Sequence, residues 1–272
     1  MKRLNNIGCL MVTFAMALLA CEPIEDRLQL KNSFDPEKIE LKVVQPNVGS
    51  NKLSLQMNTP GVVGYWDYGI DRGFTDRVEV VYPIPGKHTF TFYVTNGYLP
   101  GNDLSEVEYV SKSIEVQIDK LDYELPAAYY RLVGEDLQAK TWVFDRSNPD
   151  MWWYMTDADW NVFWWQPDVG DCPDADGEMV FDLKGGANYT YYSAPDAEAV
   201  TGSTWGFNKD YTKLTIKGDA NILGVAGGAE NNTGSKEYQI LELTDERLVL
   251  FQSDMVWSPG WVWVFKAKSN PT

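Results

Sequence analysis

The chain has 272 residues, 44% of them hydrophobic, and carries 39 Asp and Glu against 23 Lys and Arg, a formal net charge of −16. This length has room for two domains of ordinary size, each with its own core. The negative charge repels phosphate backbones and anionic head groups, so it argues against nucleic acid as a ligand and leaves neutral ligands open.

Residues 1–20 have the composition of an export signal. Lys2 and Arg3 give a positive start, and residues 7–20 form an apolar run that is shorter than the about 20 residues needed to span a bilayer. The segment closes on Leu18-Leu19-Ala20-Cys21, which resembles the lipobox of bacterial lipoproteins. The resemblance implies that Cys21 is acylated and becomes the mature N-terminus. The alternative is a plain signal peptide with an incidental cysteine.

The residues that follow Cys21 bear on the location of the protein. Glu22, Glu25 and Asp26 place acids directly after the anchor, which is similar to the signal that sends Bacteroidetes lipoproteins to the outer face of the outer membrane. A lipoprotein cysteine carries several acyl chains, and several chains anchor stably where one holds only marginally. We therefore expect a lipid-anchored protein of the outer membrane that faces the cell exterior. The alternative is an acidic, solvated linker.

The first half of the mature chain reads as a tether and a small β-domain. Residues 21–35 are polar and without periodicity, which is typical of a tether. Residues 36–119 show short alternating runs between turn residues, the pattern of β-strands. In one run, His88 shares a strand face with the apolar side chains of Phe90, Phe92 and Val94. The pattern predicts a small antiparallel β-sandwich.

Two motifs in this half resemble a PKD domain, which is an immunoglobulin-like module. They are Trp66-Asp67-Tyr68-Gly69 and the Pro85-Gly86 turn that leads into a threonine-rich strand. The sequence departs from the family after Gly69, where Ile70-Asp71 stands in place of the usual Asp-Gly. The resemblance implies a role in spacing or protein contact, without catalysis.

The second half predicts a larger β-domain. Residues 120–136 break the strand pattern and are predicted to be a connector, and residues 137–268 return to short strands joined by turns. The expected strands cover residues 141–145, 160–166, 178–183, 188–192, 203–207, 212–217, 221–225, 237–243, 247–252 and 260–266. Consecutive strands joined by short turns favour antiparallel neighbours, so either an up-and-down barrel or a two-sheet sandwich is expected. The fold class is therefore all-β.

A second resemblance covers most of this domain. Residues 140–145, 218–224 and 238–250 read KTWVFD, GDANILG and YQILELTDERLVL. They are similar to the lipocalin-like C-terminal β-domain of PKD-containing Bacteroidetes surface lipoproteins. The resemblance implies a place in polysaccharide utilisation, with a SusC/SusD-type transporter complex as a partner. Residues 147–153 replace the family's Gly-His-Phe-Gly type segment, so the ligand specificity does not carry over.

Tryptophan is the main candidate for ligand binding. Five tryptophans lie within residues 152–165, and residues 148–159 are predicted to be an exposed loop. Sugars present C–H faces that stack on indole rings, and their hydroxyls bond to carboxylates and amides. The predicted site for a neutral polysaccharide or oligosaccharide comprises Trp152, Trp153, Tyr154, Asp157, Trp160, Trp165 and Trp257.

The competing interpretation of these tryptophans is core packing. Trp261, Trp263 and Phe265 share a strand face opposite Val262 and Val264, so part of this strand is predicted to be core. Residues 160–165 alternate with aromatic side chains on both faces. One set of those tryptophans must therefore point away from the core or into a cavity.

A weaker candidate is a calcium loop. Four carboxylates lie close together ahead of a glycine, at Asp168, Asp171, Asp174 and Asp176. Such a loop can ligate Ca²⁺, although the spacing fails the EF-hand pattern. The alternative is an acidic exposed loop. Apart from this calcium candidate, no cofactor is predicted.

Catalysis is not expected. The single histidine, His88, lies in a PKD-like strand, which excludes a histidine-based triad or zinc site in the second domain. Acidic residues are abundant enough to leave a carboxylate pair for glycoside hydrolysis open, but no segment resembles a hydrolase signature. Outside the signal and the anchor, Cys172 is the only cysteine, so no disulfide framework is predicted.

The sequence thus predicts a non-catalytic surface lipoprotein that binds extracellular glycan. One alternative is a lipocalin-like carrier of a small apolar ligand, which a solidly packed β-domain would contradict. The other alternative is an accessory protein-interaction module of an outer-membrane complex, which a flat tryptophan patch without polar residues would favour.

Overall fold

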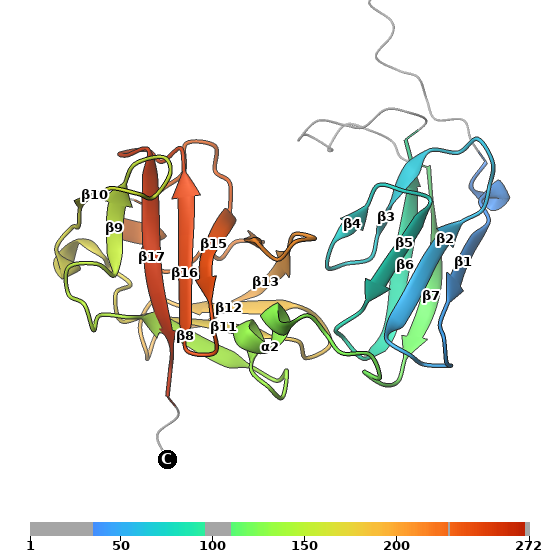
Figure 1. Ribbon diagram of the computed structural model, residues 1–272, viewed down its shortest axis with the longest axis horizontal. Coiled ribbons are helices and arrows are strands. Elements are labelled where there is room, and N and C mark those ends of the chain that lie inside the picture. The colour runs from blue at the N-terminus through green and yellow to red at the C-terminus, as the bar shows by residue number, and fades with distance from the viewer. Residues whose placement is uncertain (1–34, 96–109, 228, 270–272) are drawn as a thin grey trace, which may run out of the picture.

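The computed structural model describes residues 35–95, 110–227 and 229–269, with 46% strand and 7% helix. Cys21, the predicted signal and almost all of the predicted tether lie outside the described residues. Figure 1 shows a pair of small sheets on the right and a barrel on the left. The prediction of an all-β chain is confirmed.

The N-terminal strands, which we call the first unit, form two antiparallel sheets. Their orders among the described residues are β1-β2-β5 and β4-β3-β6-β7. A short 3-10 helix, η2 (Pro36–Lys38), precedes them. The strands are β1 (Leu41–Val44), β2 (Lys52–Met57), β3 (Gly64–Asp67), β4 (Arg72–Gly73), β5 (Arg77–Val81), β6 (Gly86–Val94) and β7 (Val110–Ile118). Side chains from both sheets are buried in one core.

The alternation predicted for residues 88–94 is confirmed. Phe90 and Phe92 are buried on one face of β6. The ring of Phe92 meets the ring of Trp66 of β3 edge-on, with centroids 5.4 Å apart. His88 donates a hydrogen bond through Nε2 to the carbonyl oxygen of Ile84 at 2.8 Å, which gives the histidine a structural role.

Eight of the described strands close into an antiparallel β-barrel. Neighbours in sequence pair with each other from β11 to β17, and β8 joins the two ends because it pairs with both β11 and β17. The barrel strands are β8 (Lys140–Phe144), β11 (Glu178–Asp182), β12 (Asn188–Tyr192), β13 (Val200–Phe207), β14 (Lys213–Lys217), β15 (Glu237–Leu243), β16 (Arg247–Ser253) and β17 (Gly260–Ala267). Of the two architectures expected from the sequence, the barrel is the observed one.

One edge of β17 is shared between two partners. Residues 265–267 pair with β8, whereas residues 260–263 pair with β9 (Trp153–Thr156). Strand β9 in turn pairs with β10 (Phe163–Trp165), which is the outermost strand of the sheet. The β9–β10 ribbon therefore extends the sheet beyond the closed barrel (Figure 1).

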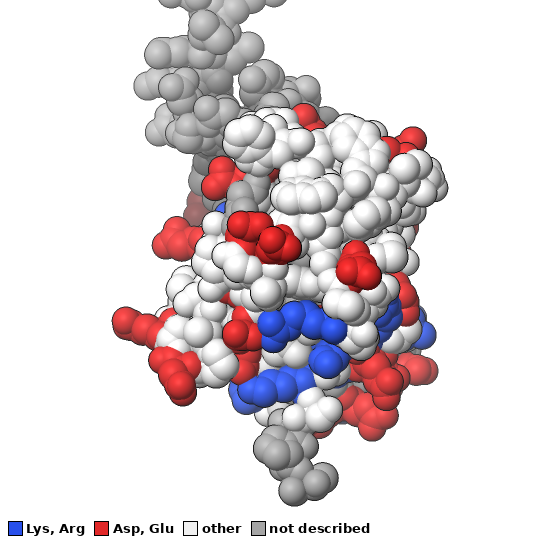
Figure 2. Space-filling model, turned by 90° about the vertical axis from the view of Figure 1, so that its left-hand side faces the viewer, with Lys and Arg blue, Asp and Glu red and all other residues white. Residues whose placement is uncertain are grey.

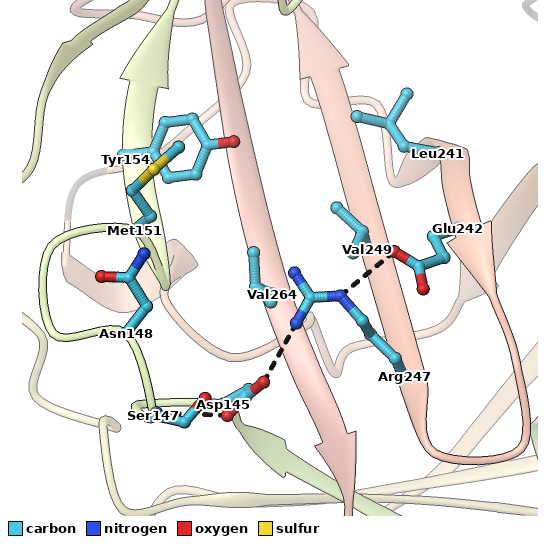
Figure 3. Close-up of a pocket in the computed structure, with 10 residues that line it drawn as sticks. All are labelled: Asp145, Ser147, Asn148, Met151, Tyr154, Leu241, Glu242, Arg247, Val249 and Val264. Carbon is cyan, nitrogen blue, oxygen red and sulfur yellow. Dashed lines mark hydrogen bonds and ion pairs between the residues drawn. The ribbon is translucent and has the colours of Figure 1, made fainter.

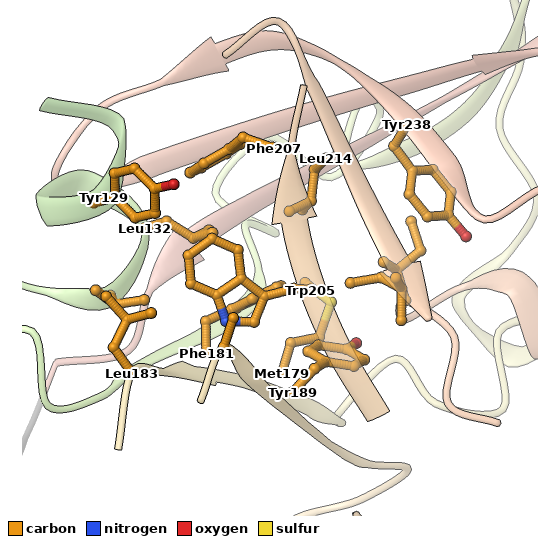
Figure 4. Packing of buried hydrophobic residues seen from close by; sticks show 14 of the residues in the cluster. Tyr129, Leu132, Met179, Phe181, Leu183, Tyr189, Trp205, Phe207, Leu214 and Tyr238 are labelled. Atoms are coloured by element: carbon orange, nitrogen blue, oxygen red, sulfur yellow. The ribbon is translucent and has the colours of Figure 1, made fainter. Parts of the chain in front are cut away.

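Large side chains occupy the barrel interior (Figure 4). The rings of Trp205 and Phe207 on β13 lie 5.3 Å apart, centroid to centroid. Helix α2 (Ala127–Val133) adds Tyr129, whose ring is edge-on to Phe207 at 5.5 Å, and the fully buried Leu132. The indole N–H of Trp142 donates to the carbonyl oxygen of Leu132 at 2.9 Å. These contacts hold α2 against the barrel.

Residues 221–225 are not a strand, so this part of the strand prediction is wrong. Gly224 has φ +89°, outside the β region, and its N–H donates to both carboxylate oxygens of Asp174 at 3.0 and 3.1 Å. A Cβ at Gly224 would lie 2.9 Å from the indole nitrogens of Trp153 and Trp263. The apolar residues of this segment are buried as a turn against the barrel core, not as part of the sheet.

The N-terminal sheets and the barrel also touch at β13. A Cβ at Gly206 of β13 would lie only 2.9 Å from the carbonyl oxygen of Ile70, in the turn between β3 and β4. Glycine therefore permits this close approach of two backbones. Tyr129 and Tyr211 lie in the same region of the barrel, with ring centroids 6.0 Å apart.

Cys172 provides a test of the packing around Asp174. Burial, together with the neighbouring Asp174 carboxylate, raises the pKa of the Cys172 thiol well above its ordinary value, so the reactive thiolate is scarce. We expect Ellman's reagent to label the native protein far more slowly at pH 8 than the protein in denaturant. Labelling at equal rates in both conditions would contradict the buried position.

Candidate functional site

Exposed aromatic side chains gather around the β9–β10 ribbon and the neighbouring loop between β16 and β17. Trp165 is 52% exposed and Trp257 is 73% exposed, against a barrel interior in which most tryptophans are fully buried. The others in this set are Trp160, Phe163 and Trp164. Figure 2 shows that this side of the molecule carries a broad face with few charges, bordered by acidic side chains and by a group of Lys and Arg below.

A cavity of about 650 Å³ opens beside β10. We call it the aromatic pocket, and its lining includes Pro149, Asp150, Trp152, Phe163, Trp165 and Asp168. Gln166 fixes its wall, because its side-chain oxygen accepts from the backbone N–H of Trp152 at 3.0 Å and its side-chain nitrogen donates to the Pro149 carbonyl oxygen. The pocket therefore has a hydrogen-bonded wall beside the exposed ring of Trp165.

Polar groups stand around these rings. Asp150 and Asp168 are exposed members of the pocket lining. Arg146 also lines the pocket, and its charge is offset by an ion pair with Asp176. An apolar ring beside hydrogen-bond acceptors is the combination that a neutral sugar requires.

A second cavity of about 250 Å³ lies on the other side of the loop that joins β8 to β9 (Figure 3). We call it the arginine pocket, and its lining includes Asp145, Asn148, Met151, Tyr154, Glu242 and Arg247. The Arg247 guanidinium contacts the Asp145 carboxylate at 3.0 Å and the Glu242 carboxylate at 3.1 Å. Two carboxylates thus hold the guanidinium in one orientation.

Electrostatics in the arginine pocket favour the charged form of Asp145. Burial alone would raise the pKa of Asp145, but hydrogen bonds from Ser147 and the charges of Lys266 and Arg247 outweigh it and lower that pKa. Burial raises the pKa of Tyr154, so its hydroxyl keeps its proton at neutral pH. The pocket therefore offers a hydroxyl donor beside an arginine that is already neutralised.

The prediction that Trp152 and Trp153 lie in an exposed loop is wrong. Trp153 begins β9 and is fully buried, with its ring 4.9 Å from that of Trp261. Trp152 is 2% exposed and meets Phe144 edge-on at 4.7 Å, although it also lines the aromatic pocket. Pairing of β9 with β17 places these rings in the core.

Tyr154, Asp157 and Trp160, which were also predicted to bind the ligand, do not lie together in one pocket. Tyr154 is half-buried, lies 5.4 Å from the ring of Phe163 and lines the arginine pocket. Asp157 accepts from the N–H groups of Asn161 and Val162, so its carboxylate shapes the turn after β9. Trp160 is at φ +54° in that turn and packs edge-on against Phe251.

Trp165 is the predicted binding residue that the structure places in the aromatic pocket with an exposed ring. Trp257 is exposed, but it is not part of the lining of either pocket. The sequence did not predict roles for Phe163 and Gln166, and of the arginine pocket it pointed only to Tyr154. A signal for Phe163 was present, because Phe163-Trp164-Trp165 is apolar on both faces of a strand and cannot bury both.

The four carboxylates of the candidate calcium loop do not converge, so this expectation is not supported. Asp168 and Asp171 cap the short helix η3 (Val169–Asp171), and Asp176 pairs with Arg146. Asp174 is buried and accepts from Gly224, from the Tyr191 hydroxyl at 2.8 Å and from the Cys172 thiol. Within the described ranges, no group of three or more His, Cys, Asp or Glu side chains is placed to hold a metal ion.

None of the helices in the described parts of the chain has the length and hydropathy to cross a membrane. Comparison of the chain with models of known protein families and with curated proteins finds no match in either set.

Proposed function

We propose that this protein is a non-catalytic surface lipoprotein that binds a neutral extracellular polysaccharide or oligosaccharide at the aromatic pocket. The observation that carries the proposal is the pair Phe163 and Trp165, two large rings about half exposed on an outermost strand and beside a cavity. Full burial of such a ring contributes about 1.5–3 kcal/mol, and leaving each ring about half exposed forgoes part of it, which points to an external ligand.

Three features support a neutral sugar over other ligands. Asp150, Gln166 and Asp168 supply hydrogen-bonding groups around the rings, which a simple protein-contact patch does not need. The net charge of −16 disfavours an anionic ligand. The barrel interior is occupied by rings such as Trp205 and Phe207, so the lipocalin-like carrier is the weaker alternative.

The remaining parts of the proposal rest on the sequence. Cys21 would anchor the protein to the outer membrane, with Glu22, Glu25 and Asp26 directing it to the cell exterior. The two-sheet unit would act as a PKD-like spacer, and a SusC/SusD-type transporter complex is the proposed partner. Cys21, Glu22, Glu25 and Asp26 lie outside the described part of the chain.

The test is affinity electrophoresis of the protein without its lipid against a panel of neutral plant and fungal polysaccharides, followed by calorimetric titration with the best ligand. Trp165→Ala should weaken binding about 2- to 12-fold, because stacking of one ring contributes about 0.5–1.5 kcal/mol. The melting temperature should hardly change, since the ring is half exposed.

Trp164 provides a matched control. It is the neighbour of Trp165 in β10, has nearly the same exposure and lies outside the lining of the pocket. Trp164→Ala should leave the affinity unchanged. Equal losses for the two variants, or no loss for Trp165→Ala, would contradict the site. New reducing ends released from the best polysaccharide, above a boiled control, would overturn the non-catalytic assignment.

A further inference from the structure

The two pockets share one wall. The loop that joins β8 to β9 contributes four residues to the lining of the arginine pocket: Asp145, Ser147, Asn148 and Met151. The same loop sends Arg146, Pro149, Asp150 and Trp152 to the aromatic pocket. A ligand longer than one pocket therefore has to cross this loop, or the aromatic side chains next to it, to reach the other pocket.

An aromatic contact links the two cavities. Tyr154 lines the arginine pocket, Phe163 lines the aromatic pocket, and their ring centroids are 5.4 Å apart. The two rings are tilted by 47° to each other and both are partly exposed. They form a continuous apolar surface along which the C–H faces of successive sugar units can lie.

The base of the arginine pocket continues this apolar surface. Val249 and Val264 line the pocket and belong to a small cluster of buried residues separate from the main core. Tyr154 and Leu241 pack against that cluster. A sugar ring entering this pocket would meet aliphatic and aromatic carbon on one side and polar groups on the other.

Arg247 determines what kind of sugar unit suits the pocket. Its Nε and Nη1 atoms contact Glu242 and Asp145, whereas the third guanidinium nitrogen is drawn without such a contact, between Val264 and Val249 (Figure 3). Guanidinium has five N–H donors, so these two contacts do not exhaust them. Because two carboxylates offset its charge, the group suits a neutral hydroxyl oxygen better than a carboxylate.

We infer that the arginine pocket is a second sugar subsite, and that the ligand is a neutral oligosaccharide or polysaccharide segment that spans both pockets. This inference rests on the proposed glycan function. The aromatic pocket binds the ligand by ring stacking, and the arginine pocket adds hydrogen bonds to units farther along the same chain. Mono- and disaccharides would then bind only in the aromatic pocket.

The experiment is calorimetric titration with a graded series of oligosaccharides from the polysaccharide that binds best, from the monosaccharide upward. The affinity for short oligosaccharides should reflect the aromatic pocket alone. It should increase further once the oligosaccharide is long enough to reach the arginine pocket. Arg247→Lys, which keeps the charge but loses the fork of donors, should weaken binding about 2- to 12-fold for long oligosaccharides and leave short ones unaffected. Trp165→Ala should weaken binding at every length.

A second variant guards against an indirect effect of Arg247→Lys. Met151 is exposed and lines only the arginine pocket, so Met151→Ala should show the same length dependence with an unchanged melting temperature. Binding that depends on Trp165, but not on chain length, Arg247 or Met151, would overturn the second subsite and leave the proposed function standing. Failure of every glycan to bind would overturn both.

Discussion

Trp263→Ala is expected to lower the free energy of unfolding by about 3–5 kcal/mol, the usual cost of removing a buried tryptophan. The ring is fully buried, lies edge-on to Tyr238 at 5.7 Å and stacks with Trp261 at 6.4 Å. Its removal leaves a cavity in a barrel whose strands cannot move together without breaking the closed sheet. Denaturant unfolding followed by near-ultraviolet circular dichroism measures the loss.

Two companion variants make this result specific. Trp263→Phe keeps most of the ring and removes an indole N–H that has no hydrogen-bond partner among the described residues, so its loss should be clearly smaller. Trp257→Ala removes a side chain that is 73% exposed and should stay within about 0.5 kcal/mol of the parent. A Trp263→Ala protein that unfolds like the parent would place this ring outside the core.

Asp174→Ala is expected to cost about 3 kcal/mol or more, because one buried carboxylate is the acceptor for several donors. The Gly224 N–H and the Tyr191 O–H both point at it, at 2.8–3.1 Å. Each buried donor left without an acceptor costs about 1–3 kcal/mol. The loss of the Gly224 contact should also loosen the turn that packs against Trp153 and Trp263.

Conservative variants separate the acceptor role of Asp174 from its volume. Asp174→Asn keeps the shape and one acceptor oxygen, so it should be less destabilising than Asp174→Ala. Tyr191→Phe removes a single donor and should cost about 1 kcal/mol. Thermal unfolding of the three proteins gives the order, and an alanine variant as stable as the parent would show that these hydrogen bonds contribute nothing to folding.

Strands with one clear pattern could be predicted from the sequence. Residues 178–183 and 188–192 became β11 and β12 almost to the residue, because alternation and flanking turns agree there. The barrel could not be distinguished from a sandwich, since closure depends on the pairing of Phe265 with Phe144, which lie far apart in the chain. Local patterns carry no information on that contact.

The candidate site was predicted less well, and the reason is burial on both sides of one short strand. Trp153 and Thr156 of β9 are buried while Tyr154 and Met155 are half-buried, which is not a period of two that sequence reading can recognise. The neighbouring Pro149-Asp150 and Thr156-Asp157 pairs favoured a loop. Trp165 could be predicted because the strand expected over residues 160–166 carries aromatic side chains on both faces, and one set has to point away from the core or into a cavity.

The close approach of Ile70 and Gly206 has a mechanical consequence. A barrel joined to the first unit only by the chain between β7 and β8 would act as a swivel. A second point of backbone contact opposes that rotation. The exposed rings therefore keep a fixed orientation relative to the N-terminal sheets. A long polymer bound at these rings would therefore transmit tension to the N-terminal sheets without first rotating the barrel.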